Sequence, residues 1–131
     1  MKTGSCLCRA VTLTIAGDLP QPNFCHCRMC RKQTGHYLAS TDVPRKALTV
    51  AGEEAVTWYR SSEGIRRGFC SVCGSTLFWD RLDRDYISVA MGVFEGLTAT
   101  RASLHIFVAD KGDYYDIADG LPQYDTVPPR E

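Results

Sequence analysis

Seven cysteines in 131 residues constrain this chain more than any other feature of its sequence. They fall into three groups, which read CLC from residue 6, CHCRMC from residue 25 and CSVC from residue 70. The first residues, MKTGSCLCRAV, contain no apolar stretch typical of a secretory signal. We therefore expect a cytoplasmic protein. In the reducing cytoplasm, clustered cysteines are more often metal ligands or redox catalysts than disulfide partners.

The first and last groups together predict a closed metal site. Two residues between Cys70 and Cys73 let both sulfurs reach one zinc ion at about 2.3 Å, and Gly74 permits the tight turn that follows. Cys6 and Cys8 form a second, less common half-site. Four thiolates complete the tetrahedral coordination of zinc and leave no position for a substrate, so we predict a structural role.

The middle group supplies three thiols from one loop, Cys25, Cys27 and Cys30, which we call the triplet. Three protein ligands and an open fourth position are typical of catalytic zinc. The spacing also permits Cys6 and Cys8 to share an ion with the triplet, but a division into four and three leaves no thiol unexplained. We predict two zinc sites, of which the triplet is the more labile.

Basic side chains at Arg28, Arg31 and Lys32 alternate with and follow the triplet. Zinc with three thiolates carries one net negative charge, which such side chains can neutralise through hydrogen bonds. They can equally hold an anionic substrate beside the metal, so we predict that they bind substrate.

Simpler interpretations stand beside these predictions. A redox dithiol is the main rival for Cys70 and Cys73, although such a motif usually opens a helix and this one lies between two strand patterns. The triplet itself could be a redox or storage site, or bind nothing. We do not expect His26 to bind metal, because in an extended stretch it points away from both neighbours. His36 and His105 fit surface and strand positions.

Short apolar and β-branched stretches recur along the chain and predict strands. They occupy residues 10–17, 37–43, 48–52, 55–60, 64–69, 75–82, 86–94 and 102–108. Residues 28–35 predict two helical turns closed by Gly35. This pattern is typical of a mainly antiparallel β fold, and the length fits one zinc-binding domain over residues 1–131.

Charge and hydropathy argue against two classes of partner. Lys and Arg number 15, as do Asp and Glu, so no net charge attracts nucleic acid or an anionic membrane. No apolar run reaches the roughly 18 residues that a membrane span needs. We interpret GIRRG at residues 64–68 as a solvated hairpin and the acidic side chains of the tail as surface groups, one of which could act as a general base.

Four motifs in a fixed order resemble one known family. They are GSCLCRAV from residue 4, CHCRMCRKQTG from residue 25, FCSVCGSTLF from residue 69 and HIFVADKGDYYDIADGLPQYD from residue 105. Residues 4–125 resemble the glutathione-dependent formaldehyde-activating enzyme (GFA) family, which shares its domain with centromere protein V type proteins. The resemblance implies a twisted, mainly β fold of the Mss4-like type. Arg9 departs from the pattern, because the family usually has glycine there.

The resemblance also implies roles for the cysteines. Cys6, Cys8, Cys70 and Cys73 match the family's structural zinc ligands, and the triplet matches its catalytic zinc ligands. The activity implied is that of a carbon–sulfur lyase of the S-(hydroxymethyl)glutathione synthase type, which joins formaldehyde to glutathione or separates them. We therefore predict a zinc-dependent lyase acting on a thiol adduct, as a monomer or homodimer. A non-catalytic zinc-stabilised binding module and a thiol or zinc sensor are the alternatives.

Overall fold

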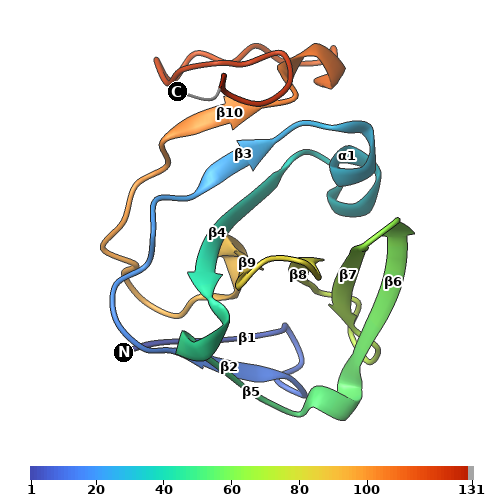
Figure 1. Ribbon diagram of the computed structural model, residues 1–131, viewed down its shortest axis with the longest axis vertical. Coiled ribbons are helices and arrows are strands. Elements are labelled where there is room, and N and C mark those ends of the chain that lie inside the picture. The colour runs from blue at the N-terminus through green and yellow to red at the C-terminus, as the bar shows by residue number, and fades with distance from the viewer. Residues whose placement is uncertain (130–131) are drawn as a thin grey trace.

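Short strands dominate the computed structural model, which describes residues 1–129 (Figure 1). Those residues contain ten strands, one α-helix and four single-turn 3₁₀-helices. The strands are β1 (Lys2–Ser5), β2 (Thr12–Ile15), β3 (Asn23–Cys25), β4 (Leu38–Pro44), β5 (Leu48–Ala51), β6 (Val56–Ser62), β7 (Ile65–Cys70), β8 (Thr76–Arg81), β9 (Tyr86–Ala90) and β10 (Leu104–Ile106). The helices are α1 (Arg28–Thr34), η1 (Arg45–Ala47), η2 (Glu53–Ala55), η3 (Met91–Val93) and η4 (Val108–Asp110).

The strands form two sheets. The smaller has the order β1-β2-β5, and the larger has the order β10-β3-β4-β9-β8-β7-β6. Every pairing between these strands is antiparallel except that of β10 with β3, which is parallel. The predicted mainly β class is confirmed, and each predicted strand is present with shifted ends. The last two residues of the predicted domain, 130 and 131, lie outside the described residues.

Two strands and one pairing were not predicted from the sequence. β1 and β3 lie beside the first two cysteine groups, where polar residues, Gly and Pro conceal any alternation. Each is completed by pairing: β1 pairs with β2, the next strand along the chain, and β3 pairs with β4 and with β10, which is distant in sequence. Tertiary pairing therefore decides these elements rather than local propensity.

One hydrophobic cluster contains side chains of both sheets. Leu13 and Ile15 of β2 are buried, as the alternation in that stretch predicted, and they belong to the same cluster as Leu77 of β8 and Val89 of β9. Burying each such side chain contributes about 1.5–3 kcal/mol. The core thus fixes the frame from which the cysteine loops project.

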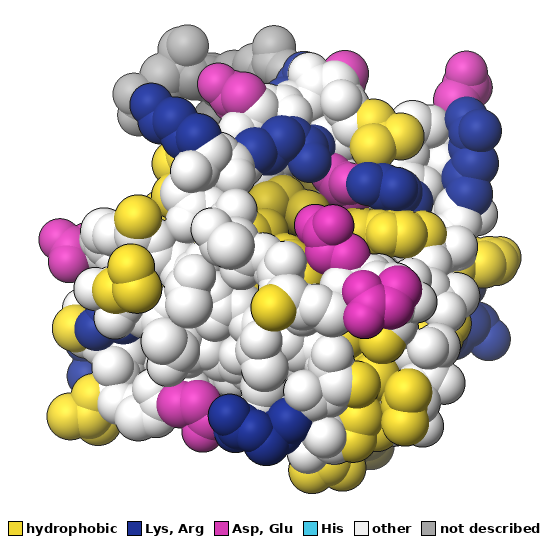
Figure 2. Space-filling model, turned by 90° about the horizontal axis from the view of Figure 1, so that it is seen from below, with side chains coloured by type: hydrophobic (Ala, Val, Ile, Leu, Met, Phe, Trp, Pro, Cys, Tyr) yellow, Lys and Arg dark blue, Asp and Glu magenta, His cyan; other side chains and the backbone are white. Residues whose placement is uncertain are grey.

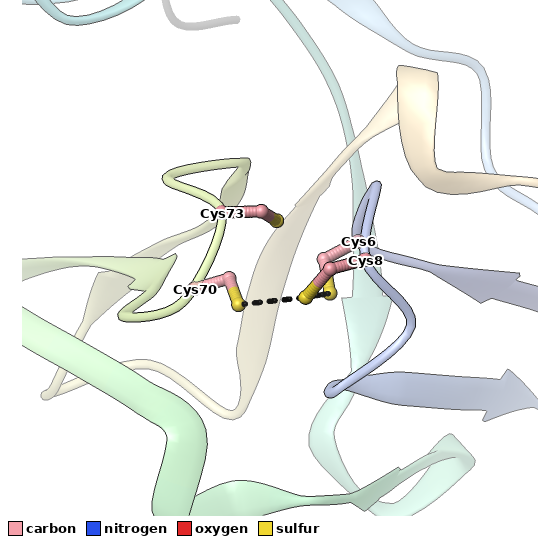
Figure 3. Close-up of side chains that lie close together, drawn as sticks. All are labelled: Cys6, Cys8, Cys70 and Cys73. Atoms are coloured by element: carbon pink, nitrogen blue, oxygen red, sulfur yellow. Dashed lines mark hydrogen bonds between the residues drawn. The ribbon is translucent and has the colours of Figure 1, made fainter.

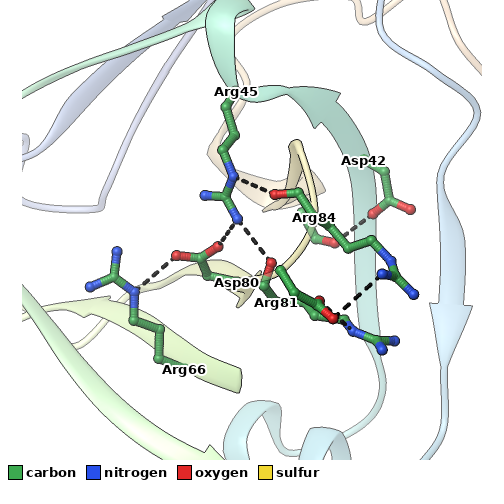
Figure 4. A network of polar contacts seen from close by, with 8 residues as sticks. Asp42, Arg45, Arg66, Asp80, Arg81 and Arg84 are labelled. Carbon is green, nitrogen blue, oxygen red and sulfur yellow. Dashed lines mark hydrogen bonds and ion pairs between the residues drawn. The ribbon is translucent and has the colours of Figure 1, made fainter. Parts of the chain in front are cut away.

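A buried ion cluster ties η1 to the larger sheet (Figure 4). Asp80 of β8 is fully buried and accepts from Arg45 Nη2 at 2.6 Å and from Arg66 Nε at 2.9 Å. The Arg66 guanidinium also lies 3.8 Å from the centre of the Trp58 ring. Both carboxylate oxygens are paired, so removing either arginine would leave a fully buried carboxylate oxygen without its partner.

Charged side chains of both signs are interspersed on the face seen in Figure 2, in keeping with the zero net charge. None of the helices in the described part of the chain is long and apolar enough to cross a membrane.

Candidate metal centres

The four-cysteine cluster joins segments far apart in the sequence (Figure 3). Cys6 and Cys8 lie in the turn after β1, whereas Cys70 ends β7 and Cys73 lies in the turn before β8. The four sulfurs lie within 4.8 Å of one another. The cluster thus connects the smaller sheet to the larger one.

Sulfur separations test whether this cluster fits zinc. Two sulfurs on a tetrahedral zinc ion lie about 3.8 Å apart, given Zn–S bonds of about 2.3 Å. The sulfurs of Cys6 and Cys8 are 3.7 Å apart, and those of Cys8 and Cys70 are 3.8 Å apart. These two separations match the value for a shared zinc ion, and the four sulfurs together are compatible with a closed, four-thiolate metal site.

Backbone groups hold the turns at Cys6–Cys8 and Cys70–Cys73 in this geometry. The N–H groups of Val11 and Val72 donate to the sulfurs of Cys6 and Cys70, at 3.3 and 3.4 Å. Gly74, at φ 80°, donates its N–H to the carbonyl oxygen of Cys70 at 2.8 Å and so closes the second turn. These backbone donors are neutral, so they fix the positions of the sulfurs without adding charge to the cluster.

Arg9 follows Cys8 with a positive φ of 68°. Left-handed backbone costs a residue with a Cβ roughly 1–2 kcal/mol, which glycine avoids. A glycine at this position would therefore make the same turn without strain.

The triplet comes from a single loop. Cys25 ends β3, Cys27 is the N-cap of α1, and Cys30 lies in the first turn of that helix. The Cys27 sulfur accepts the N–H of Cys30 at 3.4 Å, and Gly35 closes the helix in the left-handed conformation, as predicted. The three sulfurs lie within 4.8 Å of one another, in a group separate from the other four.

The three neighbouring thiols shift one another's pKa values. The nearby thiols of Cys25 and then Cys30 lower the pKa of Cys27 to about 2. The nearby Cys27 sulfur in turn raises the pKa of Cys25. A thiolate is the form that binds metal, so the loop favours the chemistry that a three-ligand site needs.

Arg67 of β7 is a member of this site that the sequence did not indicate. We expected residues 64–68 to form a solvated hairpin; the hairpin is present, but the solvated interpretation is wrong for Arg67, which is 5% exposed. Its Nη1 donates to the Cys30 sulfur at 3.4 Å and to Gln33 Oε1 at 2.9 Å. The side chain turns inward because α1 covers this part of the strand with polar acceptors.

A buried polar chain lies behind the triplet loop. The Tyr115 hydroxyl donates to His26 Nδ1 at 2.8 Å, His26 Nε2 lies 2.8 Å from His105 Nδ1, and His105 Nε2 lies 2.7 Å from Asp119 Oδ2. Because a carboxylate can only accept, His105 donates from Nε2 to Asp119, and a His26 that accepts from Tyr115 at Nδ1 donates from Nε2 to His105 Nδ1.

The burial of His26 favours the neutral form of its ring. Desolvation, followed by the nearby His105, lowers the pKa of His26 to about 4. His26 thus points away from the metal ligands, as expected, and fastens the C-terminal segment to β3 and β10. Asp119, expected at the surface, remains 41% exposed while it completes the chain of hydrogen bonds.

The predicted basic residues gather around one hollow. Arg28, Arg31 and Lys32 line a hollow of about 360 Å³ together with Gly35, His36 and Tyr114. Arg28 and Arg31 each directly follow a cysteine of the triplet. The Arg31 Nε is buried and has no hydrogen-bond partner among the described residues. The hollow therefore offers cationic donors, and none of its lining residues is acidic.

The fold and the two thiol clusters define a small, mainly β protein with one closed and one open potential metal site. A sequence model of the glutathione-dependent formaldehyde-activating enzyme family matches residues 1–110, and the chain belongs to this family. This confirms the predicted family.

Two known proteins are similar to the chain. A curated relative from Schizosaccharomyces pombe, named an uncharacterized lyase, is 29% identical over 117 residues, covering 88% of this chain and 85% of the relative. The crystal structure of a Rhodobacter sphaeroides protein matches with a TM-score of 0.63 and 22% identity, covering 74% of this chain and 91% of that one. The second likeness shows a shared fold.

Proposed function

We propose that this protein is a zinc-dependent carbon–sulfur lyase that forms or cleaves an adduct between a thiol and an aldehyde, with glutathione and formaldehyde as the substrate pair. The observation that carries the proposal is the convergence of three thiols at the start of α1, the helix whose Arg28, Arg31 and Lys32 line a cationic hollow. Family membership and the lyase name of the yeast relative support it.

In this proposal the two clusters have different roles within one domain over residues 1–131. Cys6, Cys8, Cys70 and Cys73 hold a structural zinc ion, and the triplet holds a catalytic one. Zinc bound at the triplet would supply a positive, open position at which a substrate thiol is held in its reactive thiolate form.

The basic hollow positions the substrate. Glutathione carries carboxylates, and Arg28, Arg31 and Lys32 offer charge-assisted hydrogen bonds to them. Anchoring these carboxylates on α1 would let the substrate thiol reach the triplet and would leave the aldehyde as the only freely diffusing reactant. Much of the rate enhancement is then expected to come from proximity.

The reaction balances without a further reactant. The substrate sulfur attacks the aldehyde carbon, one C–S bond forms and the carbonyl π bond breaks. The carbonyl oxygen then takes up a proton, which replaces the proton that the thiol lost. We propose His36 and Tyr114, which are hydrogen-bonded to each other on the wall of the hollow, as the groups that exchange these protons.

Cobalt substitution tests the proposal, because cobalt(II) thiolate sites absorb visible light. Glutathione should produce a saturable change in the cobalt spectrum, and Cys27→Ser should abolish it. Exchanging Arg28, Arg31 and Lys32 for glutamine should weaken glutathione binding more than binding of an uncharged thiol such as mercaptoethanol. The matched control neutralises the exposed Lys46, Arg60 and Arg101, which lie away from the hollow.

The outcomes separate the candidate functions. A response to all thiols with no preference for glutathione keeps a zinc–thiol mechanism and changes the substrate. A spectrum that no thiol alters contradicts the lyase and favours a zinc-stabilised binding module. Ready, reversible oxidation of the triplet with loss of its metal favours a sensor.

A further inference from the structure

Arg67 is a buried cation whose neighbours include no carboxylate. Its Nε donates to Ser61 Oγ at 3.1 Å, and its Nη1 donates to Gln33 Oε1 and to the Cys30 sulfur. Within residues 1–129, no Asp or Glu oxygen lies within 4.0 Å of its guanidinium. Every hydrogen-bonded neighbour of the guanidinium is therefore a neutral group except the Cys30 sulfur, which carries a negative charge as a thiolate.

The contrast with Arg66, the preceding residue, shows how unusual this is. Arg66 remains partly exposed and pairs with the buried carboxylate of Asp80 at 2.9 Å. Arg67 is far more buried, and a guanidinium cannot become neutral by losing a proton. A buried charge without a counter-charge strongly destabilises a fold. The compensating charge must therefore come from the atoms that Arg67 touches, and only the Cys30 sulfur can carry one.

We propose that Arg67 is the charge-compensating and positioning residue of the triplet. This inference rests on the proposed function, because it requires a metal ion at Cys25, Cys27 and Cys30. A divalent ion with three thiolates has one excess negative charge, and Arg67 supplies the matching positive charge from the protein side. The exposed face of the site then remains free for the substrate.

Arg67 also fixes where the Cys30 sulfur lies. One nitrogen, Nη1, contacts both Cys30 and Gln33, which are three residues apart on α1 and so share one face of the helix. Arg67 thereby fastens α1 to β7, the strand that ends at Cys70. The same strand thus carries a ligand of the four-cysteine cluster and the cation that serves the triplet.

Metal affinity tests this role directly. Residues that hydrogen-bond to metal ligands typically change metal affinity about 10–100-fold when they are replaced. Arg67→Met and Arg67→Gln should weaken the triplet's affinity for zinc by about that factor in chelator competition, while one zinc ion stays at the four-cysteine cluster. Arg67→Lys should restore part of the affinity, because it keeps the charge but not the planar fork. The control is Arg60→Met on the neighbouring strand, since Arg60 is exposed.

A spectroscopic signature separates charge compensation from a purely structural role. In the cobalt-substituted protein, loss of the positive charge beside sulfur should move the sulfur-to-metal charge-transfer bands to lower energy. Arg67→Lys should move them partly back. A packing defect alone would broaden the bands without this ordering of the variants.

Each outcome decides the inference. If Arg67→Gln and Arg67→Met retain wild-type affinity and band positions, the assignment of Arg67 is wrong while the lyase proposal stands. If the wild-type protein takes up one metal ion only, the lyase proposal fails and the inference fails with it. Should Arg67→Met not fold, as seen by loss of both metal ions, Arg67→Gln provides the same comparison with the polar contacts retained.

Discussion

The two cysteine clusters use the same ligand atom in opposite ways. The four-cysteine cluster draws on residues 6–8 and 70–73, so it forms only when two distant turns have already met. The triplet draws on residues 25–30, a single loop whose geometry follows from the end of β3 and the first turn of α1. Metal bound at the first is a cross-link of the fold, whereas metal bound at the second is an addition to it.

The two cysteine clusters also differ in the charge of the groups around their sulfurs. The four-cysteine cluster is hydrogen-bonded by backbone N–H groups and by Ser75, which are neutral. The Cys30 sulfur of the triplet instead accepts a hydrogen bond from the buried guanidinium of Arg67, and Arg28 and Arg31, which follow Cys27 and Cys30, line the basic hollow. A positive charge therefore contacts the triplet, whereas the hydrogen bonds to the four-cysteine cluster come from neutral groups.

The largest expected effect comes from breaking the four-cysteine cluster. Cys73→Ser should leave the protein unfolded or insoluble, because structural zinc contributes about 10–16 kcal/mol and a typical domain is stable by only about 5–15 kcal/mol. Cys27→Ser should change the unfolding free energy by less than about 1 kcal/mol, since a serine hydroxyl can cap α1 in place of sulfur. Thermal unfolding followed by circular dichroism compares the two. Equal effects of both substitutions would remove the distinction between the clusters.

Stepwise metal removal should distinguish the two sites in the wild-type protein. Mild chelation is expected to take one zinc ion from the triplet, with its three protein ligands, and to leave the fold intact. The second ion should leave only with cooperative unfolding, seen in the fluorescence of Trp58 and Trp79. Simultaneous release of both ions during unfolding would contradict two independent sites.

The polar chain behind the triplet should contribute less to the unfolding free energy than the metal at the four-cysteine cluster. Tyr115→Phe leaves His26 Nδ1 buried without a donor, which should cost about 1–2 kcal/mol of unfolding free energy. Tyr114→Phe is the matched control, because Tyr114 is 64% exposed and its loss should cost less than about 0.5 kcal/mol. Denaturant titration measures both.

The pH dependence of that contribution has a definite sign. Desolvation raises the pKa of Tyr115 above its usual value near 10.0, so the folded protein keeps a proton that the unfolded chain loses. The contribution of Tyr115 to the unfolding free energy is fully present below about pH 10 and falls as the pH rises through the raised pKa. The difference between wild type and Tyr115→Phe should therefore narrow above about pH 10. A difference that widens there would show that the hydroxyl is not held protonated.

The smallest expected effect is a gain in stability. Arg9→Gly should relieve the left-handed backbone after Cys8 and raise the unfolding free energy by about 0.5–1 kcal/mol, after allowance for the greater freedom of glycine in the unfolded chain. Arg9→Ala keeps the strain and removes only the exposed pair with Glu95, so it should give no gain. Melting temperatures of the two variants make the comparison, and equal temperatures would assign the effect to charge.

The sequence determined the cysteine pattern, most strands and the family. These depend on spacings of a few residues: CSVC brings two sulfurs within reach of one ion, VTLTI puts Val11, Leu13 and Ile15 on one buried face, and Gly35 ends α1. Local backbone geometry fixes such relations, so they can be derived from residue order.

Only the tertiary structure decided what surrounds the sulfurs. Nothing near Arg67 in the sequence indicates that it meets Cys30, 37 residues away, and His26 meets His105 across 79 residues. The parallel pairing of β10 with β3 creates the second contact, and the packing of α1 against β7 creates the first. Burial, which turns an ordinary arginine or histidine into a compensating charge or a neutral hydrogen-bonding group, is a property of the folded chain, because it depends on which distant segments exclude water from the side chain.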